Sequence, residues 1–209
     1  MSSAAYVERW EAFLDWLHAA VPATAARLNP PADEAAIAEL EAVIGHLLPE
    51  AVRAGWHRCD GEQADVKIGA IFGFEWLSVS SVLRHWRDWE YVRASNVGED
   101  MATLRMFATS QPDGAIQAEY TDPGWIPLFR WPLEGDYVGI DFAPGAKGAA
   151  GQIISFGRDV DDKQVLAPDF DTLLGWLASE ATSGRTRPTD GLKWHPDGTL
   201  IAALGNARL

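Results

Sequence analysis

Residues 125–166 read WIPLFRWPLEGDYVGIDFAPGAKGAAGQIISFGRDVDDKQVL, and this stretch decides the fold class. Short runs of aromatic and β-branched residues alternate here with glycine, proline and aspartate, the residues that dominate turns. Closely spaced runs of this kind, joined by short connections, are typical of an antiparallel sheet. With one more run just upstream, we expect strands over 115–120, 125–131, 137–142, 152–156 and 164–166.

The sequence on either side of these strands has a helical pattern. Apolar residues recur at helical spacing in 6–17, 37–44, 52–59, 79–86 and 170–177. Asp33, Ser78 and Asp169 are suited to cap three of these helices, and Pro49 is suited to open another. Helices before and after a block of strands predict an α+β fold, with a central antiparallel sheet and helices packed on one face.

Three further elements are expected outside these blocks. Short apolar runs predict strands over 68–74 and 101–108, and the turn residues Pro196-Asp197-Gly198 predict a terminal hairpin over 192–204. The predicted organisation is an N-terminal helix in 1–27, an α+β domain in 28–182, and a linker with a hairpin in 183–209 that packs on the same domain.

The chain is strongly acidic. Its 209 residues carry a net charge of −13, with a pI near 4.7. This balance argues against DNA, RNA and anionic membranes as direct partners, because those ligands require cationic surface. It favours a basic protein as the partner, while the alternative is that the charge serves solubility alone.

Cysteine content and hydropathy indicate a soluble cytoplasmic protein. Cys59 is the single cysteine, so an intramolecular disulfide is excluded. Residues 1–17 contain four charged side chains and lack the apolar core of a signal peptide. No stretch approaches the roughly 20 apolar residues that span a bilayer.

The ten tryptophans are the second unusual feature of the composition. We expect most of them to fill the core. Those that fall off the apolar helix stripes suit a protein interface, because an indole ring buries a large area with few rotatable bonds. The candidate interface tryptophans are Trp16, Trp89 and Trp131.

Carboxylates gather at several predicted turns, and three readings of them stay open: solvated turns, a recognition surface, or an acid–base or divalent-metal site. The recognition reading makes seven of them candidate protein-binding residues: Asp60, Glu62, Asp65, Glu119, Asp122, Glu134 and Asp136. A further group, Asp159, Asp161 and Asp162, follows the same pattern.

Motifs for catalysis, metals and cofactors are absent from the sequence. Gly145, Gly148 and Gly151 lack the P-loop order, since Lys147 precedes the second glycine and a strand follows the third. His57 and Cys59 lie two apart, a spacing that points side chains in different directions on a helix. No histidines occur at ligand spacing, and no Gly-x-Ser-x-Gly elbow occurs. We therefore expect no catalytic residue, metal ligand or cofactor.

Several short motifs, taken in order, resemble one family. They are Leu28-Asn-Pro-Pro31, the amphipathic 37–44 with Glu41, Leu48-Pro49-Glu50, Asp60-Gly61, Trp125-Ile-Pro127, GDYVGIDFAP at 135–144, Gly151-Gln152-Ile153 and the closing helix 170–177. The set resembles the SUKH superfamily, which includes the fungal cell-wall-assembly (glucan synthesis) regulator and many bacterial relatives. The resemblance covers 28–178, while 129–132 is bulkier than is usual and 185–209 lies outside it.

This resemblance implies an α+β fold around an antiparallel sheet, with no established active site. Bacterial members resemble immunity proteins that neutralise toxins, often nucleases, and fungal members resemble regulatory scaffolds. The motif residues are expected to be architectural. Trp125 and Pro127 would anchor a strand, and Asp141, Pro144 and Gly151 would shape the following turn.

Three hypotheses follow for function. The favoured one is an immunity protein (antitoxin) whose acidic surface binds a basic toxin domain. The alternative is a regulatory or scaffolding domain of the cell-wall-assembly type. A metal-dependent hydrolase that uses the carboxylate clusters is the third.

Overall fold

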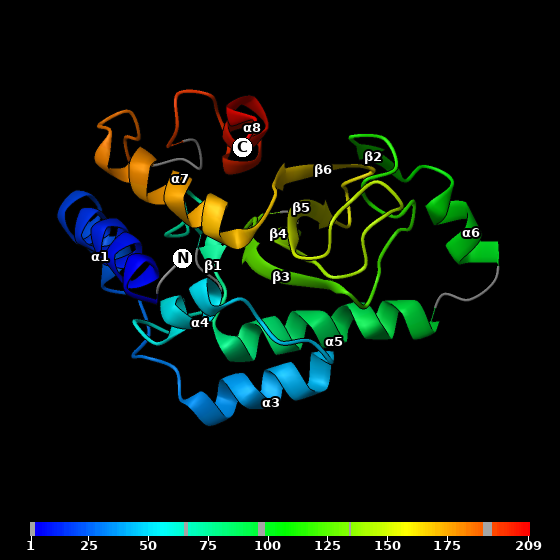
Figure 1. Cartoon of the computed structure of the whole chain (residues 1–209), viewed down its shortest axis with the longest axis horizontal. Coiled ribbons are helices and arrows are strands. Elements are labelled where there is room, and N and C mark those ends of the chain that lie inside the picture. The colour runs from blue at the N-terminus through cyan, green and yellow to red at the C-terminus, as the bar shows by residue number, and fades with distance from the viewer. Residues whose placement is uncertain (1–2, 65–66, 96–98, 134, 190–193) are drawn as a thin grey trace.

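The computed structural model describes residues 3–64, 67–95, 99–133, 135–189 and 194–209. Within these residues the chain forms one six-stranded sheet with helices packed against it (Figure 1). The strands lie side by side in the order β1-β3-β4-β5-β6-β2. Their bounds are β1 Glu75–Trp76, β2 Thr109–Gln111, β3 Trp125–Arg130, β4 Asp136–Asp141, β5 Gln152–Gly157 and β6 Asp162–Ala167.

The sheet is antiparallel except at one edge. β1, β3, β4, β5 and β6 pair with their neighbours antiparallel. β2 joins β6 in parallel, with Thr109 opposite Asp162. The predicted α+β class with a central antiparallel sheet is confirmed.

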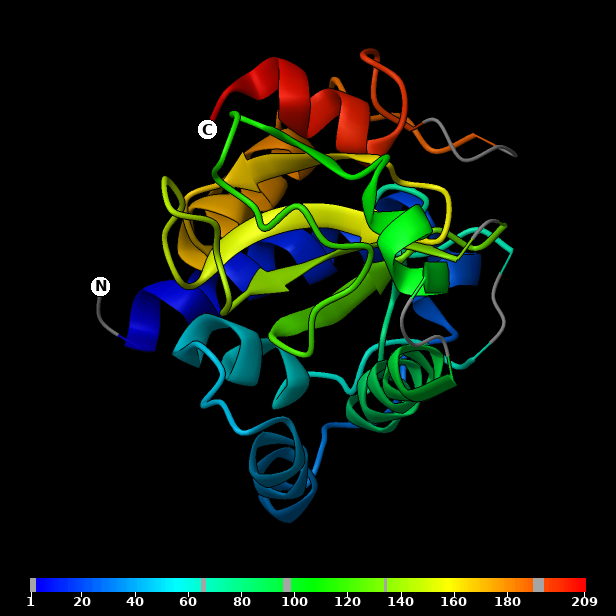
Figure 2. The ribbon, with the colours of Figure 1, turned by 90° about the vertical axis from the view of Figure 1, so that its right-hand side faces the viewer.

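The helices are α1 Ser3–Ala20, α2 Pro22–Ala25, α3 Glu34–Ile44, α4 Glu50–Trp56, α5 Val79–Ser95, α6 Glu99–Arg105, α7 Phe170–Thr182 and α8 Leu200–Ala207. Helices α1 and α7 pack together behind one face of the sheet, and the segment between β2 and β3 crosses the other face (Figure 2). Helix α5 packs against β3 and also against α3, while α8 packs on β6. Both faces of the central strands are therefore covered.

Capping residues start the helices where the sequence predicts. The carboxylate of Asp33 accepts a hydrogen bond from the Ala35 amide at 3.1 Å, and that of Asp169 accepts one from the Thr172 amide at 2.7 Å. The hydroxyl of Ser78 accepts one from the Ser81 amide at 3.2 Å. Each side chain satisfies a backbone donor that has no partner within its helix.

Tryptophan rings fill much of the core. Trp10 stacks on Trp76 with ring centroids 4.4 Å apart and an interplanar angle of 7°, and its indole N–H donates to the Ala51 carbonyl at 2.8 Å. A buried indole with its N–H satisfied adds apolar area without leaving an unpaired donor. The expectation that most of the tryptophans are core residues is confirmed for Trp10, Trp56, Trp76, Trp86, Trp125 and Trp194.

Backbone pairing explains two unusual residues of the central strands, Pro127 and Gly139. Proline has no amide hydrogen, but Pro127 is tolerated in β3 because β1 pairs only with Phe129 and Arg130 and because the register shifts after Pro127. Opposite it, a Cβ atom at Gly139 would lie 2.1 Å from the Ile126 carbonyl oxygen. Only glycine allows the backbones of β3 and β4 to approach this closely.

The strand predicted at 115–120 is wrong. This segment is irregular and makes a single bridge to the sheet-end loop, between Ile116 and Pro144. The Ala115 carbonyl accepts hydrogen bonds from the Gly145 amide and the Gln152 side chain, so its partners are a loop and a side chain instead of a strand. Ile116 is buried. Residues 115–120 thus pack over the sheet instead of forming one of its strands.

The strand predicted at 68–74 is also wrong. The chain folds back on itself through bridges between Gly69 and Gly73 and between Ile71 and Phe74. Positive φ angles of 48° at Phe72 and 100° at Gly73 make this tight turn. The strand β1 begins only at Glu75.

Two more predicted elements prove to be helices. Residues 101–108 lie mainly in α6, and the strand follows it as β2. The terminal hairpin predicted at 192–204 is replaced by α8, whose Leu200, Ala203 and Leu204 are buried at helical spacing. Thr199 caps α8 by accepting a hydrogen bond from the Ala202 amide at 3.4 Å. Residues 192 and 193 of the predicted hairpin lie outside the described residues.

Candidate protein-binding site

An aromatic hollow opens where α5, the segment between β2 and β3, the start of β4 and the turn after β5 meet. Its volume is about 430 Å³. It is lined by Asp88, Trp89, Val92, Tyr120, Gly135, Tyr137 and Arg158. We call this hollow the aromatic pocket.

Three rings form its walls. Trp89 meets Tyr120 edge to face, with centroids 5.7 Å apart and an interplanar angle of 71°. Trp89 meets Tyr137 in the same manner at 6.4 Å and 73°. Such edge-to-face pairs are favourable because the positive edge of one ring faces the negative face of the other. Trp89 and Tyr120 are half-buried, so both keep surface for a ligand.

Helix α5 holds the neighbouring segment in place. The indole N–H of Trp86 donates to the Pro123 carbonyl at 2.8 Å, and Arg93 donates to the Thr121 hydroxyl at 2.9 Å. The Tyr120 hydroxyl donates to the Arg158 carbonyl at 3.3 Å. Tyr120 is thus tied down on both sides, and the pocket wall is preorganised although it lies on an irregular segment.

Tyr137 forms the floor from β4. Its side chain is buried, and its hydroxyl lies 3.3 Å from Nδ1 of His85. Burial, with smaller contributions from Asp88 and Asp136, raises the pKa of Tyr137 to about 12 against the opposing effect of Arg130. Burial likewise raises the pKa of Tyr120. Both phenols therefore stay neutral at physiological pH.

Two of the sequence-predicted residues are brought near this pocket. Trp89 lines it, and Asp136 acts electrostatically on both tyrosines. Glu119 precedes the wall residue Tyr120, but its side chain pairs with Arg105 at 3.1 Å and does not line the pocket. The tertiary structure thus brings together an aromatic candidate on α5 and an acidic candidate on β4.

Trp131 lies in a separate hollow. Its ring packs on Phe74 with centroids 5.0 Å apart. Asp136, Thr199 and Ile201 line the same hollow. Asp136 lines this hollow while its neighbours Gly135 and Tyr137 line the aromatic pocket, because successive strand residues point to opposite faces.

The three other acidic candidates that the structure describes accept backbone hydrogen bonds. Asp60 accepts a hydrogen bond from the Val79 amide at 2.7 Å, and Asp122 accepts one from the Gly124 amide at 2.7 Å. Glu62 is 1% exposed, and its carboxylate accepts from the amides of Ala70 and Trp76 at 2.6 and 3.0 Å. Glu62 thus offers no surface to a partner. Asp65 and Glu134 lie outside the described residues.

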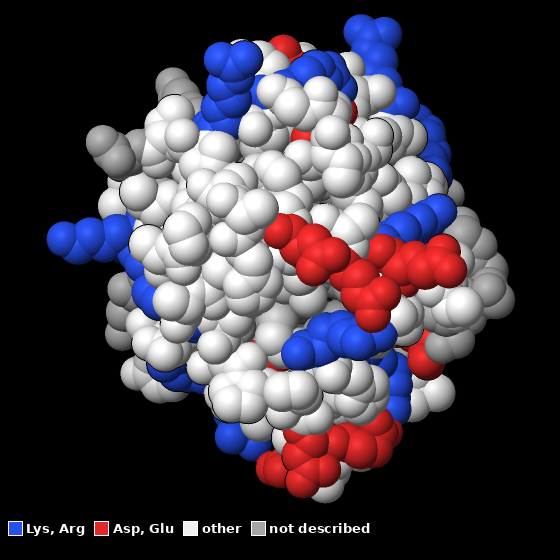
Figure 3. Space-filling view, turned by 90° about the vertical axis from the view of Figure 1, so that its left-hand side faces the viewer, with Lys and Arg blue, Asp and Glu red and all other residues white. Residues whose placement is uncertain are grey.

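Trp16 lies on α1, away from the other candidates. Its ring contacts Phe72 at 5.5 Å and Trp194 at 6.3 Å. It therefore joins the N-terminal helix to the C-terminal segment. On the face that carries α1, basic and acidic side chains lie next to one another (Figure 3), among them Arg58 with Glu11 at 2.6 Å.

The motif residues sit inside the fold. Trp125 and Pro127 are buried in β3. Asp141 is fully buried and accepts hydrogen bonds from the Ala143 amide and the Gln152 side chain, each at 2.8 Å. Burial raises the pKa of Asp141 to about 6.

The other two motif residues shape the loop between β4 and β5. Pro144 bridges to Ile116, and Gly151 has a φ of 92° that favours glycine. The contacts of the motif positions thus hold the sheet and its loops together.

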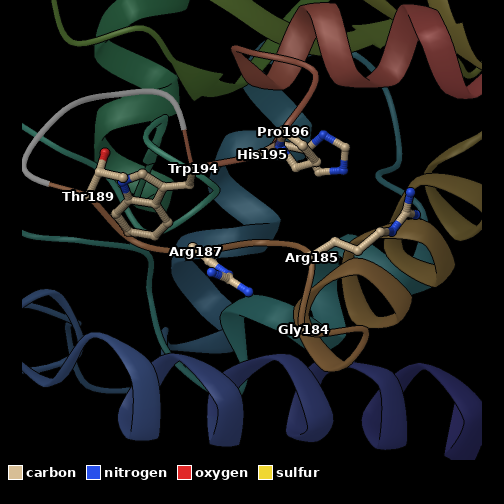
Figure 4. A pocket seen from close by; sticks show the side chains of 7 residues that line it. All are labelled: Gly184, Arg185, Arg187, Thr189, Trp194, His195 and Pro196. Atoms are coloured by element: carbon tan, nitrogen blue, oxygen red, sulfur yellow. The ribbon is translucent and has the colours of Figure 1, made fainter.

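A second hollow lies beside the C-terminal segment, with a volume of about 580 Å³ (Figure 4). His195 is buried, and its Nε2 lies 3.1 Å from Glu180 on α7. The side chain of Arg185 reaches toward α7 (Figure 4) and pairs with the same carboxylate. These contacts fasten the C-terminal segment to the domain.

Within the described residues, no three His, Cys, Asp or Glu side chains are grouped so that they are able to hold a metal ion. Burial raises the pKa of Cys59 to about 12, so its thiol is a core group and not a nucleophile at physiological pH. In the same part of the chain, no helix combines the length and the apolar character needed to cross a membrane.

Sequence reasoning missed Tyr120, Tyr137 and Arg158 as pocket residues. Tyr120 was placed in a strand that does not form, and Tyr137 follows an ordinary strand pattern. No sequence signal relates either tyrosine to Trp89, because their proximity depends on how the segment between β2 and β3 crosses the sheet.

A family model described as "SMI1 / KNR4 family (SUKH-1)" matches residues 31–176. The chain belongs to the SMI1/KNR4 (SUKH-1) family. The resemblance inferred from the motifs is therefore confirmed, and the pocket residues Asp88, Trp89, Tyr120 and Tyr137 all lie within the matched region.

Fungal regulators are among the relatives of this SMI1/KNR4 family chain. It is 30% identical to the glucan synthesis regulatory protein of Neurospora crassa, over 84% of the chain and 38% of that protein. It is 32% identical to the cell wall biosynthesis/cell cycle regulator smi1 of Schizosaccharomyces pombe, over 70% and 30% respectively. The cell wall assembly regulator SMI1 of Saccharomyces cerevisiae is 26% identical, over 84% and 40%. The chain thus spans well under half the length of these relatives.

Proposed function

We propose that this chain is a non-enzymatic regulatory domain of the cell-wall-assembly type, and that it acts by binding a protein partner at the aromatic pocket. The observation that supports the site is the trio of Trp89, Tyr120 and Tyr137, which forms a preorganised hollow at the surface. The relatives support the regulatory role, because their names describe regulation of glucan synthesis and cell-wall assembly.

The physical case for a protein ligand rests on ring rigidity. Binding hot spots are enriched in tryptophan and tyrosine, which bury large areas at small conformational cost. Trp89 is already held by two edge-to-face contacts, and Tyr120 is held through Arg158. Little side-chain freedom remains to be lost on association, so the gain from burying the rings is retained as affinity.

The immunity hypothesis is the second candidate. Its support is the net charge of −13, which would complement a basic toxin domain. The same charge would serve any basic partner. Because the named relatives are regulators, they favour the regulatory hypothesis over immunity.

Deletion of the gene in its native host separates the two candidates. For the regulatory role we expect viable cells that are sensitive to cell-wall-perturbing agents. Complementation with the wild-type chain restores resistance, whereas Trp89→Ala does not. Trp16→Ala is the matched control, since it truncates another half-buried tryptophan on the far side of the sheet.

Each outcome decides between the candidates. A deletion strain that dies unless a neighbouring toxin gene is also removed establishes immunity and overturns the regulatory proposal. Full resistance with Trp89→Ala, at wild-type protein level, removes the aromatic pocket from the function. Loss of function with both tryptophan variants indicates a folding defect, which melting curves of the purified proteins detect.

A further inference from the structure

Acidic side chains outnumber basic ones around the aromatic pocket. Asp88 lines the hollow, and its side chain is 69% exposed. Asp159 follows Arg158, whose carbonyl accepts the Tyr120 hydroxyl, and the Asp159 amide donates to the Asp136 carboxylate at 3.3 Å. Together with Asp161, these aspartates raise the pKa of Tyr120 electrostatically, after the larger effect of burial. Opposing them is the guanidinium of Arg158, which also lines the hollow.

A second basic group near the floor is already neutralised. Arg130 acts on Tyr137, but its guanidinium donates to the buried carboxylate of Glu75 at 2.7 and 2.6 Å. Among the described residues near the pocket, Asp88, Asp159 and Asp161 therefore outnumber the Arg158 guanidinium. The local field is negative, as is the chain as a whole.

We infer that the aromatic pocket binds the cationic side chain of a lysine or arginine in the partner protein, with its charge against the rings of Trp89 and Tyr120. This inference rests on the proposed function and names the chemistry of the partner. A cation is attracted to the negative face of an aromatic ring, most strongly to tryptophan. The apolar stem of lysine or arginine packs on the rings while the charged end meets the aspartates.

Other occupants fit the pocket less well. An anionic side chain would be repelled by Asp88 and by the three aspartates near Tyr120. A purely apolar or proline-rich segment would pack on the rings and gain nothing from these carboxylates. Aromatic rings bind both apolar and cationic side chains, and the aspartates around the pocket favour the cationic ones.

The test uses short capped peptides as probes with the full chain. The peptides are Gly-Gly-X-Gly-Gly, in which X is lysine, arginine, norleucine or glutamate. Norleucine keeps the apolar stem of lysine and lacks its charge. The readout is the indole N–H resonance of Trp89 in a ¹H–¹⁵N spectrum, assigned by its disappearance in Trp89→Phe.

We expect lysine and arginine peptides to shift this resonance with millimolar dissociation constants, about tenfold tighter than norleucine. The glutamate peptide is expected to leave the resonance unmoved. Equal binding by norleucine and lysine, binding by glutamate, or no binding by any cationic peptide would overturn the inference.

Two charge variants are expected to act in opposite directions. Asp88→Asn weakens lysine-peptide binding about threefold, and Arg158→Gln strengthens it by a similar factor, the size expected for exposed charges. Asp15→Asn on α1 makes the same change in net charge on the other side of the sheet, and it controls for long-range effects. If Arg158→Gln weakens binding of the lysine peptide, the charge balance at the pocket is not what attracts the cation, and the inference fails.

Failure of this inference is distinguishable from failure of the proposed function. If complementation needs Trp89 but the lysine peptide does not bind, the partner uses the pocket without a cationic anchor. If the lysine peptide binds but Trp89→Ala complements fully, the pocket has the inferred chemistry and the regulatory function lies elsewhere.

Discussion

Trp89 on α5 and Tyr120 in the segment between β2 and β3 meet edge to face, with ring centroids 5.7 Å apart. This contact closes one side of the aromatic pocket. It exists because Trp86 and Arg93, on the same helix, hold the segment through Pro123 and Thr121. These contacts bring two segments that are distant in the sequence together to form one pocket.

The ring of Tyr120, and not its hydroxyl, is expected to matter for this site. Tyr120→Phe removes a 3.3 Å hydrogen bond to the Arg158 carbonyl at a half-exposed position, which costs about 1 kcal/mol or less. Tyr120→Ala also removes the ring contact with Trp89, worth about 0.5–1.5 kcal/mol beyond area burial. Urea unfolding measures stability, and the Trp89 indole resonance reports peptide binding. Binding should persist in Tyr120→Phe and disappear in Tyr120→Ala; equal binding by both would show that this wall is dispensable.

The buried carboxyl of Glu62 is expected to make stability depend on pH. Burial raises its pKa to about 7 from 4.5, against the opposing effects of the Ala70 and Trp76 amides and Arg27. The folded state thus holds this proton more tightly than the unfolded state. Its stabilising contribution is complete below pH 4.5 and is lost as the pH rises to about 7.

Glu62→Gln tests this linkage, because the amide oxygen is able to accept the same two backbone hydrogen bonds. The shift corresponds to at most about 3 kcal/mol, so the variant should gain stability relative to wild type between pH 5 and pH 8. Urea unfolding at both pH values measures the gain, with the half-buried Glu119→Gln as control. Part of the pH dependence of stability should remain in the variant, because the pKa of Asp141 is also raised, to about 6. A wild-type and variant difference that is the same at both pH values would contradict the prediction.

Close approach of β3 and β4 makes Gly139 irreplaceable. A methyl group there would lie 2.1 Å from the Ile126 carbonyl oxygen and 3.0 Å from the ring of Phe156. We expect Gly139→Ala to lower the free energy of unfolding by about 3 kcal/mol or more. Gly151→Ala is the control, since a Cβ there meets no atom within 4 Å and only the φ of 92° is unfavourable, at about 1–2 kcal/mol. Chemical denaturation of both variants decides; equal losses would mean that packing at Gly139 is not the cause.

Glu180 is expected to hold the C-terminal segment on the domain. It is buried and engages both Arg185 and His195. In Glu180→Ala the 59% exposed Arg185 returns to solvent, but the buried His195 loses a hydrogen-bond partner, which costs about 1–3 kcal/mol. Amide hydrogen exchange should then accelerate in α8 more than in the sheet. Asp197→Ala removes a 45% exposed neighbour of His195 and should change exchange little. Unchanged protection of α8 in Glu180→Ala would refute this role.

Patterns within single segments were sufficient for much of the fold. Asp33, Ser78 and Asp169 mark helix starts because a capping bond forms between residues two or three apart. The strands β3, β4 and β5 follow from short apolar runs between turn residues. At 200–204, however, the helical spacing of Leu200, Ala203 and Leu204 was overridden by the turn signal at 196–198, and a helix was mistaken for a hairpin.

The sequence by itself determined the α+β class, the central strands and the family, because each depends on local periodicity or on motifs in fixed order. Tertiary structure alone decided that residues 115–120 cover the sheet, that Glu62 is inside, and that Asp136 lies close enough to act on both tyrosines of the pocket. Burial and proximity depend on contacts between segments far apart in the chain. Trp89 and Tyr120 meet only because the folded backbone brings them together, and no local pattern records that distance.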